Sequence, residues 1–292
     1  MKQFNDFTLV IQGPLHENSI YGLLNNYKEY TDHIIVSHWD TDNTELLQYI
    51  SEYNLPVKVI TNKMHTDYNV FNGQNVYYQV YNTLQGLREV TTKYVIKLRS
   101  DQWFGNLLPF FDAIKSNPDK YTCSNLHFRP DNLYKYHPSD KLIGGDSEFI
   151  TNTFEIALYR LKNNVQALMA GAYMYSDDSS ICTPDLINQF IKNYSYSDSN
   201  RTLITQYPDT PLLGTIQILP AGYIGTVPEI LIGTSFLFSK KIFPDPNNSV
   251  KIVKDNFFIV KVEDMVPYVN KFGNNEIEHN SVEINNIEEY GN

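Results

Sequence analysis

The chain contains very little cysteine. Only 2 of its 292 residues are Cys, and Cys123 and Cys182 lie far apart, outside any Cys-x-x-Cys or His-containing pattern. A disulfide framework and a structural zinc site are therefore not expected. The sequence indicates a reduced, intracellular protein.

Basic residues are also few. The 23 Lys and Arg against 33 Asp and Glu give a formal net charge of -10, which leaves no surplus to neutralise nucleic-acid phosphates. We expect no nucleic-acid partner, although a small anionic ligand is compatible with this charge. No run approaches the roughly 18 apolar residues that a membrane span needs. The N-terminus has no apolar signal core, so we expect a cytoplasmic protein without a transmembrane segment.

Several nucleotide-binding and catalytic motifs are missing. The sequence has no Gly-x-x-x-x-Gly-Lys-Ser/Thr and no Gly-x-Gly-x-x-Gly after its first apolar run, which argues against a P-loop NTPase and a dinucleotide oxidoreductase. It also lacks a Gly-x-Ser-x-Gly elbow and a His-Glu-x-x-His helix. No Gly-rich, basic triphosphate loop follows the first run, which disfavours a sugar nucleotidyltransferase. A nucleotide would have to be held in another way.

Apolar residues are plentiful enough for a large core, at 42 % of the chain with 14 % aromatic. Short apolar runs alternate with amphipathic stretches, which is typical of β-α-β units. The runs are rich in β-branched residues and lack strict alternation, so they predict strands buried on both faces of a mostly parallel sheet. They cover residues 7–11, 33–37, 57–60 and 93–98.

A helix is predicted over residues 73–90, where apolar residues recur at intervals of four, four and three. Asn75, Gln79, Asn82 and Gly86 form a second, uncharged polar stripe with the same spacing. Such a stripe is expected on a helix that borders a ligand cleft. A solvent-facing stripe is the alternative.

The ends of the predicted strands carry candidate ligand-binding residues, because ligands of open parallel sheets sit outside the carboxyl ends of the strands. A flexible Gly in the first turn would let the backbone approach a ligand, and an aromatic beside a carboxylate could bind a base and a ribose. A carboxylate after a buried strand suits a hard cation. The segments are Gln12-Gly13-Pro14, Trp39-Asp40 and Arg99-Ser100-Asp101. A common turn, a core tryptophan and a capping aspartate are the alternatives.

The strand-end segments and the polar helix stripe, in their order along the chain, resemble the WavE family of lipopolysaccharide-synthesis glycosyltransferases. The most specific part is Lys97-Leu98-Arg99-Ser100-Asp101 together with the Gln-Gly-Pro turn. Downstream, Tyr136-His137-Pro138-Ser139-Asp140 is similar to the family's His-x-Ser-Asp segment, and Pro228-Glu229-Ile230-Leu231 to its Glu-containing helix. The resemblance covers about residues 7 to 238.

The resemblance implies an α/β, GT-A-like fold: a Rossmann-type mixed, mostly parallel sheet flanked by helices. It also implies a nucleotide-sugar donor, with a UDP-linked sugar expected, a glycan acceptor and a divalent cation, Mn²⁺ or Mg²⁺. The usual Asp-x-Asp motif reads Arg99-Ser100-Asp101 here, so only Asp101 is left to bind the metal, and Arg99 is expected to contact a phosphate or a neighbouring carboxylate.

An inverting transfer needs a general base for the acceptor hydroxyl. The candidates are Asp140, His137 and Asp146, with Asp140 favoured because it lies in the segment similar to the family's. The alternative for residues 138–140 is a turn before a helix that begins near Ser147. A cap of that helix or an acceptor ligand is favoured for Asp146 over a base. Glu229 is a candidate second acidic partner, and a buried salt bridge is the alternative for it.

We expect one domain over residues 1–272, with a nucleotide-binding half (1–105), an acceptor half (106–245) and an added β-hairpin (246–272). The hairpin is expected to cover the sheet or to form a subunit contact in a homodimer. Residues 273–292 predict a loosely ordered tail. Helical spacing is also present over residues 155–168 and 184–194, and the polar segments 173–178 and 195–202 are candidate acceptor loops.

Two functions from different classes fit these observations. One is a metal-dependent, inverting glycosyltransferase with an Asp base. The other is a non-catalytic nucleotide- or carbohydrate-binding protein on the same fold, which the incomplete Asp-x-Asp motif would allow.

Overall fold

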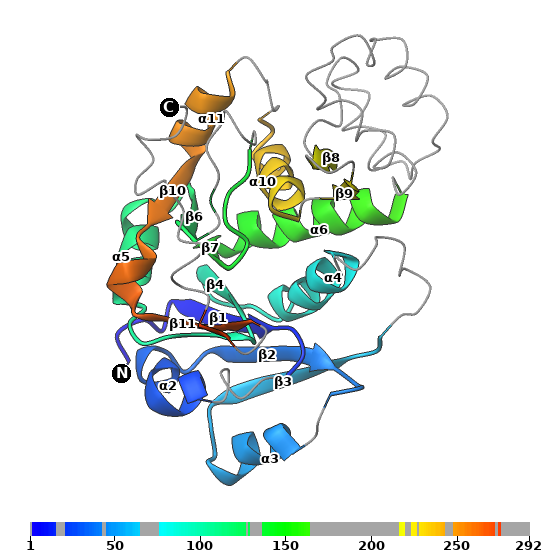
Figure 1. Cartoon of the computed structure of the whole chain (residues 1–292). Coiled ribbons are helices and arrows are strands. Elements are labelled where there is room, and N and C mark those ends of the chain that lie inside the picture. The colour runs from blue at the N-terminus through cyan, green and yellow to red at the C-terminus, as the bar shows by residue number, and fades with distance from the viewer. Residues whose placement is uncertain are drawn as a thin grey trace.

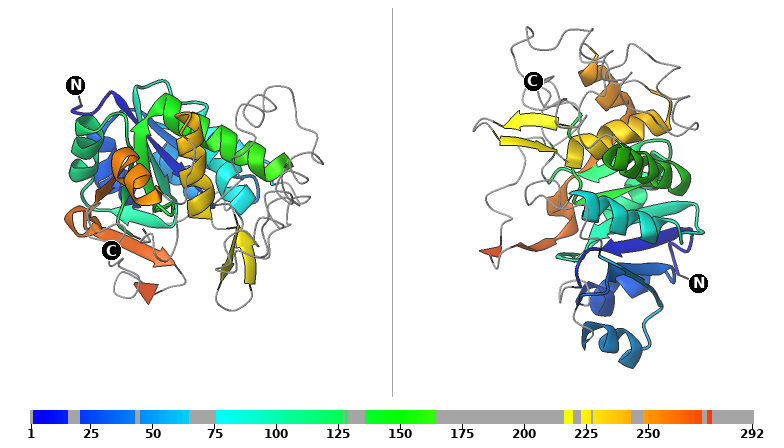
Figure 2. Two further views of the ribbon diagram at one scale, coloured as in Figure 1. Left: turned by 90° about the horizontal axis from the view of Figure 1, so that it is seen from above. Right: turned by 90° about the vertical axis from the view of Figure 1, so that its right-hand side faces the viewer.

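Helices cover both faces of a central sheet, as Figure 1 and Figure 2 show. The computed structural model describes residues 2–15, 21–42, 45–64, 76–126, 128, 136–163, 216–219, 223–226, 228–242, 248–271 and 274–275. Among the described residues, no helix combines the length and the apolar character needed to cross a bilayer.

The central sheet has seven strands in the order β10-β6-β7-β4-β1-β2-β3. These are β1 (Phe7–Gln12), β2 (Ile34–Trp39), β3 (Val57–Asn62), β4 (Tyr94–Arg99), β6 (Tyr121–Ser124), β7 (Leu142–Asp146) and β10 (Phe257–Val260). The four apolar runs of the sequence form β1 to β4. The expected mixed, mostly parallel sheet flanked by helices is confirmed.

One strand of this sheet, β7, runs against the others. It pairs antiparallel with both β4 and β6, whereas the other neighbouring strands pair in parallel. Leu142 at the start of β7 lies opposite Leu98 near the end of β4. The segment that precedes β7 is therefore brought to the same edge of the sheet as the residues that follow β4.

Alternation along β4 sends its side chains to two different cores. Val95 packs in the core beneath one group of helices, and Ile96 and Leu98 pack in the core beneath the other. Lys97 and Arg99 share the face of Val95, because side chains two positions apart point to the same side. The first group comprises α4 (Val76–Leu87), α6 (Ser147–Asn163), α10 (Pro228–Ser239) and α11 (Ser249–Asn256). The second comprises η1 (Leu23–Tyr27), α2 (Lys28–Tyr30), α3 (Glu45–Glu52), α5 (Leu108–Ser116) and η4 (Val262–Met265).

The carboxyl ends of β1, β2 and β4 meet. The amide of Gly13 donates to the Ser37 carbonyl (3.2 Å), and the amide of Ser100 donates to the Gln12 carbonyl (2.9 Å). Gly13 has φ +123°, and a Cβ there would lie 2.6 Å from the Ser100 hydroxyl oxygen. This turn therefore requires glycine. The proximity expected for the strand ends is confirmed.

Two smaller sheets complete the described structure. One has the order β12-β11-β5 and joins β5 (Gln102–Phe104), directly after β4, to β11 (Pro267–Lys271) and β12 (Asn274–Asn275). The other pairs β8 (Ile216–Leu219) with β9 (Tyr223–Thr226). β12 lies within the segment expected as a tail. The predicted helix over 184–194 and the candidate loops 173–178 and 195–202 lie outside the described residues.

The hairpin predicted near the C-terminus is wrong. Its first half forms helix α11, in which Ser249, Val253 and Asn256 are buried at intervals of four and three. Its second half is β10, which pairs with β6 in the central sheet. A short apolar run fits a helix and a strand equally well, and here the helical spacing decides. The segment after residue 246 thus completes the central sheet.

Candidate functional site

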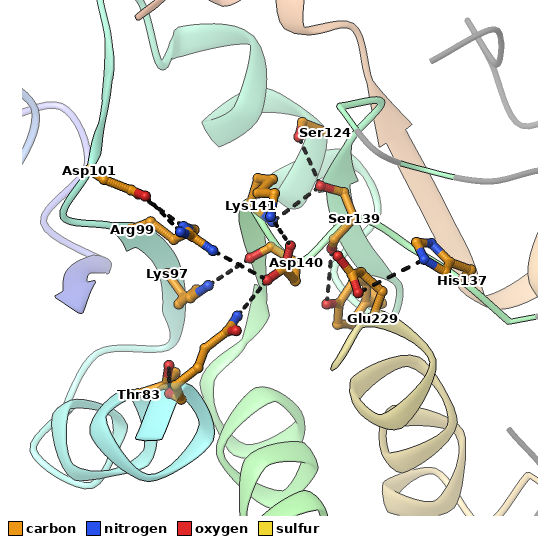
Figure 3. Close-up of polar contacts among 12 residues, drawn as sticks. Thr83, Lys97, Arg99, Asp101, Ser124, His137, Ser139, Asp140, Lys141 and Glu229 are labelled. Carbon is orange, nitrogen blue, oxygen red and sulfur yellow. Dashed lines mark hydrogen bonds and ion pairs between the residues drawn. The ribbon is translucent and has the colours of Figure 1, made fainter. Parts of the chain in front are cut away.

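A group of charged side chains lies where the end of β4, the segment before β7 and the start of α10 come together (Figure 3). We call this group the charged cluster. It comprises Lys97, Arg99, Asp101, Asp140, Lys141 and Glu229. The antiparallel pairing of β7 with β4 and the packing of α10 on α6 bring these residues together from three distant parts of the chain.

Lys97 anchors the cluster from within the sheet. Its side chain is 0 % exposed, and its ammonium donates to the main-chain carbonyl of Asp140 (2.6 Å). Burial lowers the pKa of Lys97 from 10.5 to about 7, against the opposing effect of the nearby Asp140 carboxylate. Lys97 therefore fixes the position of Asp140 and carries only part of a charge at neutral pH.

Arg99 and Asp101 form a two-pronged ion pair at the end of β4. Nε of Arg99 donates to Oδ1 of Asp101 (2.9 Å), and Nη2 donates to Oδ2 (2.6 Å). Burial opposes ionisation of Asp101, but the hydrogen bonds and charge of Arg99 hold its pKa below the ordinary value. The third guanidinium nitrogen, Nη1, lies 3.9 Å from Oδ2 of Asp140. The expectation that Arg99 contacts a neighbouring carboxylate is confirmed.

Asp140 is the hub of the cluster and is 1 % exposed. Its Oδ1 lies 3.1 Å from the Lys141 ammonium, and its Oδ2 accepts a hydrogen bond from the Gln79 amide. Burial alone would raise the pKa of Asp140, but Lys141, Lys97 and Arg99 hold it well below its ordinary value. Asp140 is therefore a permanently ionised group surrounded by cations.

Glu229 is the acidic residue that faces Asp140 from the first turn of α10. Its side chain is 12 % exposed, and Oε2 lies 3.9 Å from Nε2 of His137. Burial and, second to it, the negative charge of Asp140 raise the pKa of Glu229 from 4.5 to about 7. Sequence reasoning named Glu229 as a second acidic partner, with a buried salt bridge as the alternative, but did not place it among the candidates for the base. The signal that could have identified it was its place in the segment similar to the family's Glu-containing helix.

The polar stripe of α4 faces the interior. Gln79 reaches Asp140 across the site, and Asn82 is fully buried. Gly86 is buried against β1 and β2, where a Cβ would lie 2.6 Å from Val10. The solvent-facing alternative is thus wrong for these residues. Asn75, the first member of the stripe, lies outside the described residues.

The other candidate donor-binding residues lie at the ends of β1 and β2. Gln12 is buried and Pro14 is exposed in the turn after β1. Trp39 is 3 % exposed and packs against Tyr78 and Tyr81 of α4. The ring of Trp39 is already in contact with these two tyrosines. Stacking of a nucleotide base on Trp39 stays a prediction.

The acidic residue that organises the turn after β2 is Asp42. Its Oδ2 accepts hydrogen bonds from the amides of Trp39 (2.9 Å) and Leu15 (3.0 Å), which ties the β1 and β2 turns together. The predicted residue Asp40 is exposed, and its Oδ1 accepts from the amide of Met64 (3.2 Å). Binding of a ribose by Asp40 stays a prediction.

The structure places Asp146 away from the charged cluster. It pairs with Tyr94 at the beginning of β4, whereas Arg99 ends that strand. Its Oδ1 accepts hydrogen bonds from the amides of Glu148 (3.0 Å) and Phe149 (3.3 Å), which cap α6. Asp146 is therefore a helix cap, which corrects its place among the catalytic candidates.

The residues present do not fit a divalent-metal centre. Asp101 directs both oxygens to Arg99, so a cation would have to compete with a guanidinium already in place. In the part of the chain that the structure describes, no three His, Cys, Asp or Glu side chains gather to hold a metal ion. Hard cations need several oxygen ligands. The metal binding by Asp101 that the resemblance implies is therefore left out of the function proposed below, and we derive no step through it.

Residues 7–129 match the model of the WavE lipopolysaccharide synthesis family. The resemblance indicated by the motifs is thus confirmed over this range. The WavE match covers β1 to β6 and includes Gln79, Lys97, Arg99 and Asp101 of the site. The segment before β7 and helix α10, which supply the rest of the charged cluster, lie beyond it.

Solved structures of sugar- and nucleotide-handling proteins are similar to this chain at low identity. The mannosyltransferase PcManGT from Pyrobaculum calidifontis, in complex with GDP-Man and Mn²⁺, is 10 % identical with a TM-score of 0.37, over 56 % of this chain and 52 % of its own. S. aureus TarS 1-349 is 14 % identical with a TM-score of 0.37, over 70 % of this chain and 69 % of its own. The 4-diphosphocytidyl-2C-methyl-D-erythritol synthase from Anaerococcus prevotii DSM 20548 is 12 % identical with a TM-score of 0.34, over 51 % of this chain and 73 % of its own. This level of similarity carries no argument about function. No curated protein matches the chain.

Proposed function

We propose that this protein is a glycosyltransferase that moves a sugar from a nucleotide-sugar donor to a hydroxyl of a glycan acceptor. The WavE match supports a role in polysaccharide synthesis. The observation that carries the proposal is the position of Arg99, which ends β4 opposite Gln12 and directly precedes Ser100, the residue that packs on Gly13 in the turn after β1. Phosphorylated ligands of open α/β sheets bind at this edge.

The donor diphosphate is assigned to the cationic side of the cluster. The chain as a whole carries a net charge of -10, so a dianionic ligand needs a local concentration of positive charge. Arg99 and Lys141 supply it, and their side chains are 19 % and 9 % exposed. Nε and Nη2 of Arg99 are held by Asp101, so Nη1 is the nitrogen assigned to a phosphate oxygen. Contacts of this kind strengthen as the leaving diphosphate gains charge. A UDP-linked sugar stays the expected donor.

Asp140 is assigned to positioning. A general base must hold a proton during the reaction, so its pKa should lie near the working pH. Asp140 is instead buried and ionised, with its oxygens directed to Lys141, Gln79 and Arg99. Its contacts suit a residue that fixes the phosphate-binding cations. The prediction of Asp140 as the base is tested below by direct comparison with a second carboxylate.

The experiment that tests the proposed function measures nucleotide release. The purified chain is incubated with UDP-, GDP-, TDP- and CMP-linked sugars, with and without a mixture of bacterial oligosaccharides. We expect release of nucleotide from at least one donor, slowly by hydrolysis and faster with a suitable acceptor. Tight nucleotide binding without any turnover would instead favour the non-catalytic binding protein.

A further inference from the structure

Asp140 lies between a cationic side and an acidic side of the charged cluster. On one side Arg99, which also holds Asp101, approaches Asp140. On the other side Glu229 faces Asp140 and His137 (Figure 3). The site is therefore cationic at the end of β4 and acidic at the start of α10.

We propose that Glu229 is the general base that removes the proton from the acceptor hydroxyl. This inference rests on the proposed function, since it assigns a role within the same transfer reaction. It depends on geometry: Glu229 and Arg99, which would hold the leaving diphosphate, lie on opposite sides of Asp140 (Figure 3). A single displacement requires this arrangement, because the nucleophile approaches the anomeric carbon from the side opposite the leaving group.

Accessibility favours Glu229 over its neighbour. The Glu229 side chain is 12 % exposed and that of Asp140 is 1 % exposed. The oxygens of Asp140 face Lys141, Arg99 and Gln79, whereas Oε2 of Glu229 lies 3.9 Å from an imidazole nitrogen and the Glu229 carboxyl hydrogen-bonds Asp140. An incoming hydroxyl can thus reach Glu229 without breaking the contacts of Asp140 with its cations and with Gln79.

The electrostatic surroundings of Glu229 also favour its role as the base. The titratable and charged groups that face Glu229 come from three parts of the fold. They are His137, Asp140 and Lys141 before β7, Tyr121 of β6 and Arg99 of β4. The net effect of burial and of Asp140 is a pKa of about 7, which lets Glu229 accept a proton near neutral pH and release it again.

The step balances in atoms and charge. An oxygen of ionised Glu229 takes the proton of the acceptor hydroxyl. At the same time the hydroxyl oxygen of the acceptor forms a bond to the anomeric carbon of the donor sugar. The bond from the anomeric carbon to the phosphate oxygen breaks, and its electron pair leaves with the nucleoside diphosphate. Glu229 is then neutral and returns its proton to solvent. In donor hydrolysis, water takes the place of the acceptor.

The test compares Glu229→Gln with Asp140→Asn and with Glu148→Gln, an exposed glutamate on α6 that serves as the matched control. Donor hydrolysis and nucleotide affinity are measured for each variant across the pH range. We expect Glu229→Gln to bind UDP like the wild type and to lose at least about 100-fold in turnover. Glu148→Gln should behave as the wild type. Asp140→Asn should weaken UDP binding, because it disturbs the cations.

The pH profile separates a base from a structural residue. Wild-type kcat/KM should rise with pH through about 7, since Glu229 is active only when it is ionised. This acidic limb should disappear from the residual activity of Glu229→Gln. Glu229→Asp, which keeps the carboxylate but retracts it, should retain the limb at a reduced rate. Infrared spectra should show a carboxyl group that titrates near this pH in the wild type and not in Glu229→Gln.

Three other outcomes would overturn the assignment of Glu229 as the base. If the wild type hydrolyses a donor and Glu229→Gln keeps both its rate and its pH profile, the assignment of Glu229 is overturned and the proposed function stands. If Asp140→Asn binds UDP normally and loses the acidic limb, Asp140 is the base instead. If the wild type releases nucleotide from no donor, the proposed function fails and this inference fails with it.

Discussion

The guanidinium of Arg99 holds the carboxylate of Asp101, two residues further along the chain, through hydrogen bonds of 2.9 and 2.6 Å. This pair occupies the position where the resemblance implies an Asp-x-Asp metal motif. The departure from that motif is thus accompanied by a cation of the protein itself. A fixed guanidinium at the end of β4 and an engaged Asp101 have separate, measurable consequences.

Replacing Arg99 should weaken nucleotide binding. Arg99→Met removes the cation at the phosphate edge, and hydrogen bonds between charged groups contribute about 1.5–3 kcal/mol. We expect UDP affinity, measured by calorimetry, to fall by about 10- to 100-fold, with Arg99→Lys intermediate because it keeps the charge and loses the fork. Arg88→Met serves as the control, since Arg88 pairs with Glu155 at the exposed surface. Unchanged affinity in Arg99→Met would remove Arg99 from the donor site.

Removing divalent metal should have little effect on nucleotide binding. Asp101 is neutralised by Arg99, so it has little free charge to offer a cation. UDP affinity in EDTA should lie within about threefold of the value with Mn²⁺, a difference below 1 kcal/mol. A much larger metal effect that is lost in Asp101→Asn would show that the cation displaces Arg99 and would establish Asp101 as a ligand.

Lys97 should make stability depend on pH above neutrality. Its pKa is lowered to about 7 in the folded chain from 10.5, so between these values the unfolded chain binds the extra proton. Stability therefore rises with pH across this window. The difference in unfolding free energy between the wild type and Lys97→Met should increase with pH above 7. The same comparison with Lys63→Met, an exposed lysine, should stay flat.

Gly86 offers a test of the close packing between α4 and the sheet. Alanine has the higher helix propensity, by about 1 kcal/mol, so Gly86→Ala would stabilise an isolated helix. In the folded chain its Cβ would lie 2.6 Å from Cγ1 of Val10. We expect net destabilisation of about 1–3 kcal/mol in urea unfolding. The control, Gln85→Ala on the partly exposed side of α4, should change stability by less than about 0.5 kcal/mol. Stabilisation by Gly86→Ala would show that the interface can relax.

The strands and the polar helix stripe could be predicted because their signals are local. Runs of β-branched residues identified β1 to β4, and repeated spacing identified α4. The positions after β1 and β4 followed from the rule that parallel strands end at one edge. The helix α11 was predicted as a strand, since four apolar residues do not distinguish the two periods.

The sequence predicted only some of the residues that form the charged cluster. Arg99 and Asp101 ended a recognisable strand, and Asp140 lay in a segment that resembled the family. Glu229 was identified only as a second acidic partner, and Asp146 was kept among the catalytic candidates although a helix cap was the favoured alternative. Both errors arise from topology: α10 packs across the sheet to reach Asp140, and β7 carries Asp146 to the far end.

By itself the sequence determined which segments become buried strands and helices, because hydrophobic periodicity is a local property of the chain. Its net charge, summed over all residues, predicts no nucleic-acid partner. The tertiary structure decided which charges meet. The antiparallel β7 brings Asp140 to the end of β4, where Lys97 and Arg99 keep it ionised and leave Glu229 to titrate near neutrality. Charges that lie far apart in the sequence acquire their pKa values from the neighbours and the burial that only folding supplies.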